Sequence, residues 1–153
     1  MGQQGKHLNS IHVSHEKHTA ACATEIMAIP ETVCISMSQH IGAPCKPLVA
    51  KGDAVKVGQV IGDTDAFVSA PIHSSVSGTV KEIINMRNVM GGQDQMVVIE
   101  ADGKQEVWEE IKPPVINDMQ DFIAAIRASG LVGLGGASFP THIKFNPKNL
   151  DEV

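Results

Sequence analysis

The stretch of this sequence best suited to ligand chemistry is the glycine-rich run GLVGLGGASFPTHIKF, residues 130–145. Gly133, Gly135 and Gly136 carry no side chain that would block a ligand, and successive amides in such a turn form anion-binding nests. A dinucleotide fingerprint needs G-x-G-x-x-G directly after a strand and at the start of a helix. Here Ser138 occupies the third glycine position and a helix is expected before the run. A phosphate-binding loop and a plain tight turn therefore both remain open.

The candidate thiols are Cys22, Cys34 and Cys45. Their odd number and wide spacing fit neither a disulfide framework nor a C-x-x-C site, and an iron–sulfur cluster usually takes four thiolates. Cys45 stands next to Lys46, whose charge is expected to lower the pKa of the thiol and favour thiolate chemistry. The two interpretations of Cys45 are a redox-active thiol and an inert, buried small residue.

Histidines are the other candidate ligands. His12, His15 and His18 recur every three residues and would share a zinc ion only if the backbone curled around it. No fourth ligand is evident, so the sequence predicts solvated side chains and no metal site. His40 and His73 fall in expected loops, where a lone histidine is usually solvated, although either would suit a docking face.

The region that must position these groups, residues 33–112, consists of short valine- and isoleucine-rich runs separated by glycine turns. This pattern predicts a mainly β fold, a compact barrel or sandwich. Its runs KGDAVKVGQVIGD and SAPIHSSVSGTVKEI resemble the barrel-sandwich hybrid of biotinyl and lipoyl carrier domains. Carriers present a lysine at a hairpin tip as the amine nucleophile. The matching stretch, residues 63–67, has none, and Lys56 and Lys81 are expected in or beside strands. A carrier function is therefore not expected for residues 33–112, and the remaining interpretation is a docking or scaffold module.

The flanking segments are simpler. Residues 1–32 are polar and predict an extended leader, and residues 113–153 begin with a two-proline linker. Asn117 or Asp118 is expected to cap an amphipathic helix that ends at Gly130. The apolar face of that helix comprises Met119, Phe122, Ile123 and Ile126.

Composition excludes two classes of partner. The net charge of -5 and the pI near 5.7 give no net attraction to nucleic acid. No run approaches the ~20 apolar residues of a membrane helix, so no direct membrane insertion is expected.

Two motifs in this order carry a family resemblance: SQHIGAPCKPLVAKGDAVKVGQVIGDTDAFVSAPIHSSVSGTVKEI and the glycine-rich run. From about His12 onward the chain resembles the N-terminal part of the RnfC component of the Rnf electron-transport complex. The resemblance implies a barrel-sandwich hybrid followed by a helix and the start of an α/β domain, similar to the flavoprotein subunit of respiratory complex I. The loop at the FMN and NADH site there is GGAGFPT-like, whereas Ser138 replaces its usual glycine here. The implied cofactor-binding residues are Gly133, Gly135, Gly136, Ala137, Phe139, Pro140 and Thr141.

The resemblance also implies a role. The full-length parent would pass electrons between NADH and ferredoxin or iron–sulfur centres in an ion-translocating membrane complex, using FMN and two 4Fe–4S clusters. This chain would be a non-catalytic fragment without a cofactor of its own, cytoplasmic and peripheral on the membrane. Its partners would be the other subunits. The alternative is a soluble relative that delivers NADH electrons to a reductase such as proline reductase, with Cys45 as a possible redox thiol.

Overall fold

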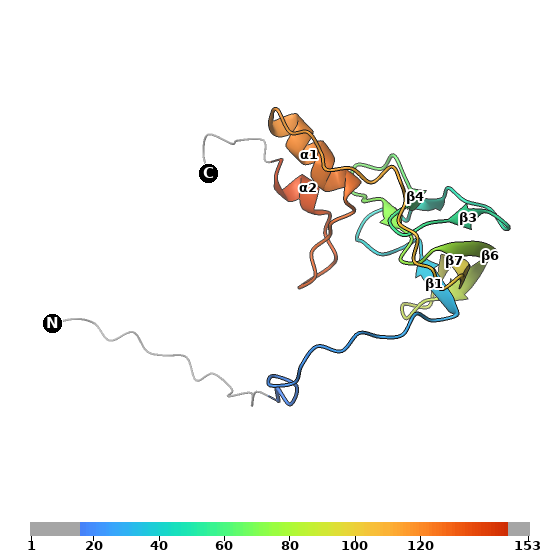
Figure 1. Ribbon diagram of the computed structural model, residues 1–153. Coiled ribbons are helices and arrows are strands. Elements are labelled where there is room, and N and C mark those ends of the chain that lie inside the picture. Colours follow the sequence, from blue (N-terminus) through green and yellow to red (C-terminus); the bar gives the residue numbers. More distant parts are fainter. Residues whose placement is uncertain (1–15, 147–153) are drawn as a thin grey trace.

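The computed structural model describes residues 16–146, which form seven strands and two helices (Figure 1). The strands lie together, and both helices follow them in the chain and lie to one side of them. The elements are β1 (Thr32–Ser36), β2 (Lys46–Pro47), β3 (Ala54–Val55), β4 (Val60–Asp63), β5 (Ile72–His73), β6 (Gly78–Arg87), β7 (Gln93–Ala101), α1 (Met119–Ala128) and α2 (Thr141–Lys144).

Two antiparallel sheets make up the β region. One has the order β1-β7-β6-β3 and the other has the order β2-β4-β5. The long β6–β7 hairpin dominates the first sheet, with Gly78 opposite Ala101 at its base and Arg87 opposite Gln93 near its tip. In the second sheet, β5 is an edge strand paired with β4. The connection between these two strands corresponds to the stretch that presents lysine in carrier domains. This arrangement confirms the predicted mainly β barrel-sandwich fold.

The core is built from aliphatic side chains together with Met37 and Cys45. The cluster of buried core residues contains no aromatic ring among the described residues. This agrees with a sequence in which only 3 % of residues are aromatic. Burying each large aliphatic side chain contributes about 1.5–3 kcal/mol. The most completely buried members are Met37, Ile61, Val80, Val97 and Ile99.

Helix α1 begins and ends where the sequence predicts. The Asp118 side chain caps it by accepting a 2.8 Å hydrogen bond from the Asp121 amide. Gly130 follows the helix with φ of 69°, a conformation that favours glycine. A Cβ at Gly130 would also lie 2.6 Å from the Pro71 carbonyl oxygen. Gly130 therefore ends the helix and lets the chain pass directly against the barrel.

The apolar face of α1 is only partly covered. Phe122 packs edge-to-face on Phe145, with ring centroids 5.6 Å apart, which holds α1 against α2. Met119, predicted on the same face, is 47 % exposed, and no residue of α1 is fully buried. The helix lies beside the barrel without contributing to its core, which explains the exposure.

Candidate functional site

The glycine-rich run forms a loop whose two ends are tied together. The Gly133 amide donates to the Phe139 carbonyl at 3.0 Å, and the Thr141 amide donates to the Leu131 carbonyl at 2.9 Å. Residues 134–137, between these ties, are all exposed. Within the described residues the chain thus presents a closed loop held at its root, preceded by α1 and followed by the four-residue α2. A dinucleotide-binding βαβ unit has neither feature, in agreement with the sequence analysis.

At two positions of this loop, neither backbone conformation nor packing against the described residues requires glycine. Gly135 and Gly136 are not in the positive-φ region, and a Cβ at either would meet no atom within 4 Å. Neither conformation nor packing explains them, so the open side of the loop can be approached closely by a ligand or another segment. Ser138 does have a positive φ, 51°, where glycine would be the less strained residue.

The remaining predicted loop residues lie along the same path. Ala137 is exposed, Phe139 and Thr141 are half-buried, and Pro140 is buried and immediately precedes α2. Six of the seven predicted residues therefore lie in the loop, and the seventh, Thr141, is the first residue of α2.

Lys144 is a residue of this site that the sequence analysis missed. It ends α2, and its Nζ atom would lie 2.9 Å from a Cβ placed on Gly133. An ammonium group therefore contacts the root of the loop, where it would attract an anion. The sequence signal that could have identified it is the lysine at the end of THIK, in the short helix that follows the loop.

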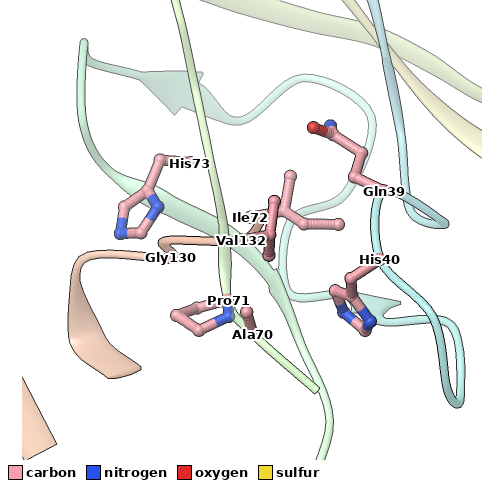
Figure 2. Close-up of a pocket in the computed structure, with 8 residues that line it drawn as sticks. All are labelled: Gln39, His40, Ala70, Pro71, Ile72, His73, Gly130 and Val132. Carbon is pink, nitrogen blue, oxygen red and sulfur yellow. The ribbon is translucent and has the colours of Figure 1, made fainter. Parts of the chain in front are cut away.

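A separate half-open pocket of about 160 Å³ lies between the barrel and the segment that leads to the loop. Figure 2 shows His40 and His73 on opposite sides of it, with the Ala70–Ile72 stretch between them. Burial lowers the pKa of His73, although a hydrogen bond to the Ala128 backbone and the charge of Asp63 oppose this. The lining residues are Gln39, His40, Ala70, Pro71, Ile72, His73, Gly130 and Val132.

Cys45 lies behind this pocket, buried and paired with His40. Its Sγ atom is 3.4 Å from His40 Nε2 and 3.3 Å from the Ala70 carbonyl oxygen. The expected lowering of the thiol pKa by Lys46 is wrong: burial, reinforced by the charge of Asp63, raises the pKa of Cys45 to about 11 against the opposing charge of Arg127. His40 also differs from expectation, since it is 8 % exposed and not solvated.

Alkylation would measure the state of this thiol. A pKa of about 11 instead of 9.0 leaves about 100-fold less thiolate at pH 7, so Cys45 is expected to react with iodoacetamide at least about 100-fold more slowly than an unperturbed thiol. The rate should rise towards a midpoint near pH 11. Exposed Cys34 is the internal control. A Cys45 midpoint near the free-thiol value of about 8.5 would contradict the burial argument.

The described residues contain no group of three or more histidine, cysteine or acidic side chains that could hold a metal ion. His12 and His15 lie outside them, and His18 Nε2 is 2.9 Å from Glu16. Within residues 16–146 no helix is long and apolar enough to cross a membrane.

Comparison with known proteins identifies the family of the barrel. Residues 6–104 match the model of the RnfC barrel sandwich hybrid domain. The chain belongs to the RnfC family. The named domain is the fold that the two sheets form, and it accounts for a carrier-like barrel without a carrier lysine.

Several curated RnfC relatives match most of the chain. The chain is 46 % identical over 136 residues to the C subunit of the proton-translocating ferredoxin:NAD(+) oxidoreductase complex of Clostridium ljungdahlii, covering 86 % of this chain and 30 % of the relative. It is 43 % identical over 146 residues to the C subunit of the Na(+)-translocating ferredoxin:NAD(+) oxidoreductase complex of Acetobacterium woodii. This match covers 93 % of this chain and 33 % of the relative. It is 33 % identical over 142 residues to the C subunit of the ion-translocating oxidoreductase complex of Rhodobacter capsulatus, and this match covers 89 % of this chain and 27 % of the relative. The chain thus spans about a third of the length of these relatives.

Proposed function

We propose that this chain is the N-terminal part of an electron-transfer subunit, in which the barrel docks on neighbouring subunits and the glycine-rich loop forms one wall of a flavin and NADH site. The relatives named as subunits of ferredoxin:NAD(+) oxidoreductase complexes support this role. The complex would lie at the cytoplasmic face of a membrane, with this part peripheral to it.

The observation that carries the proposal is the pair of unexplained glycines. Gly135 and Gly136 leave the exposed side of a tied loop open, and Lys144 places a positive charge at its root. Backbone amides and an ammonium together form a suitable site for the phosphate of FMN or of a nicotinamide nucleotide. When bound, a flavin supplies the conversion between hydride and single-electron transfer. The residues of this chain would bind and orient it.

Iron–sulfur chemistry does not fit the cysteines of this chain. Cys22 and Cys34 are exposed, Cys45 is buried, and the described residues bring no set of cluster ligands together. Such a cluster usually takes four thiolates. We therefore assign the two 4Fe–4S clusters of a full-length parent to other parts of that protein.

The alternative, a soluble relative with Cys45 as a redox thiol, has no supporting observation among the described residues. Thiol relays use low-pKa, accessible cysteines, whereas Cys45 is 4 % exposed and burial raises its pKa to about 11. The membrane-complex proposal is preferred for this reason.

A chimaera would test the flavin site. This chain would replace the matched third of the A. woodii relative, and FMN would be titrated by quenching of flavin fluorescence. The chimaera should bind FMN saturably, whereas the isolated chain should show no measurable binding, because one wall encloses too little of the ligand. Removing the Lys144 charge-assisted contact in Lys144→Ala should weaken binding about tenfold or more.

Lys51→Ala is the matched control, since Lys51 is an exposed lysine in a barrel turn. It should leave the FMN affinity of the chimaera unchanged. A chimaera that folds but binds no FMN, or a Lys144→Ala variant that binds like the parent chimaera, would argue against the proposed site.

A further inference from the structure

In this chain an arginine from α1 forms hydrogen bonds to the β4–β5 hairpin, which corresponds to the hairpin that presents lysine in carrier domains. Arg127, in the last turn of α1, donates from its two terminal nitrogens to both carboxylate oxygens of Asp63, at 2.8 and 3.2 Å. One of these nitrogens also donates to the Thr64 carbonyl at 3.1 Å and lies 3.5 Å from Ser69 Oγ. The arginine therefore contacts both sides of the β4–β5 connection, Asp63 and Thr64 at its start and Ser69 on its return.

This contact is better formed than an ordinary surface ion pair. Exposed pairs contribute little, but a two-pronged arginine–carboxylate pair has fixed geometry and is stronger. The Asp63 side chain is 29 % exposed and that of Arg127 is 35 % exposed. Burial tends to raise the pKa of Asp63, but the hydrogen bond from Arg127 and the Thr64 amide hold it below its usual value. The carboxylate is thus kept charged and paired.

The arginine lies directly before the loop. Three residues after it, Gly130 passes the barrel so closely that an added Cβ would meet the Pro71 carbonyl and the His73 ring. The tied loop then begins at Gly133. The helix itself has no buried residue, so its apolar contacts with the barrel are weak. The hairpin contact is a two-pronged, charged link between the barrel and the loop-bearing segment.

We propose that Arg127 is a positioning residue whose guanidinium, seated in the β4–β5 hairpin, fixes α1 and the glycine-rich loop in one orientation relative to the barrel. The hairpin that carriers present to partner enzymes serves as an internal docking surface in this protein. This inference concerns the position of the loop and does not depend on what the loop binds.

Distance measurements between spin labels would test it. The 153-residue chain would carry Cys22→Ser and Cys34→Ser, leaving buried Cys45 unlabelled, and new cysteines at two exposed positions, Lys51→Cys on the barrel and Ala124→Cys on α1. The distance distribution should be narrow with Arg127 present. It should broaden at least about twofold in Arg127→Ala. Arg127→Lys, which keeps the charge but loses the two-pronged geometry, should fall between them.

Two further variants separate positioning from folding. Asp63→Asn should broaden the distribution from the barrel side without altering α1, whereas Arg87→Ala, which removes an arginine from the β6–β7 hairpin, should change nothing. Helix content by circular dichroism and the emission spectrum of folded Trp108 should stay at the parent values. An unchanged distribution in Arg127→Ala, or broadening that accompanies loss of helix or barrel structure, would overturn the proposal.

Discussion

Valine in place of Gly136 is expected to weaken FMN binding by the chimaera about 10- to 100-fold while leaving its stability unchanged. The backbone at Gly136 does not have positive φ, and a Cβ there would meet no atom of the described chain within 4 Å, so the fold should accept a side chain. A ligand phosphate that approaches the loop amides would meet the new methyl groups. Each charge-assisted hydrogen bond lost in this way costs about 1.5–3 kcal/mol, which corresponds to this range.

The measurement is a flavin fluorescence titration beside a urea unfolding curve, with Gly136→Ala as an intermediate step. Ala50→Val, at an exposed barrel position, adds two methyl groups away from the loop, the same change as from Gly136→Ala to Gly136→Val, and should leave both quantities unchanged. Retained affinity in Gly136→Val would show that the open side of the loop is not a ligand surface. A fall in stability would show instead that the loop packs against something in the folded protein.

Alanine in place of Ile99 is expected to lower the free energy of unfolding of the barrel by about 2–5 kcal/mol. Ile99 is completely buried and lies near the C-terminal end of β7, opposite Val33 of β1 and Val80 of β6. Truncation removes the transfer free energy of the side chain and leaves a cavity that neighbouring strands cannot fill. Because natural domains are stable by only about 5–15 kcal/mol, this loss is a large share of the total.

Urea denaturation followed by Trp108 fluorescence would measure this change. Ile26→Ala is the matched control, because Ile26 is 98 % exposed and the same truncation should alter stability by less than about 0.5 kcal/mol. Equal, small effects of the two variants would mean that the β1-β7-β6 layer is not the centre of the core.

Much of the fold could be predicted from local sequence patterns. The strand-length runs, the Asp118 cap and the Gly130 stop are set by residues close together in the chain, so short-range rules recover them. The division of the strands into two sheets, and the 47 % exposure of Met119, depend on contacts between distant segments. Periodicity places Met119 on an apolar face, but it does not say whether anything covers that face.

The candidate site shows the same division. The glycine-rich loop was visible in the sequence because its residues are contiguous. Lys144 was missed because its value lies in the distance from its ammonium group to Gly133, across the loop. Cys45 was assigned the wrong direction of pKa shift because Lys46 is adjacent in sequence, whereas burial and the distant Asp63 determine the protonation of the thiol.

The sequence by itself determined the β-barrel pattern, the absence of a carrier lysine, the capped helix and the glycine-rich loop, since each is a property of neighbouring residues and of their backbone preferences. Only the tertiary structure decided which groups meet. In the folded chain Cys45 is buried against His40, and Arg127 bonds Asp63 of the hairpin, 64 residues away along the chain. The protonation of a group and its partners depend on local dielectric and on charges within a few ångströms, and chain folding alone determines both.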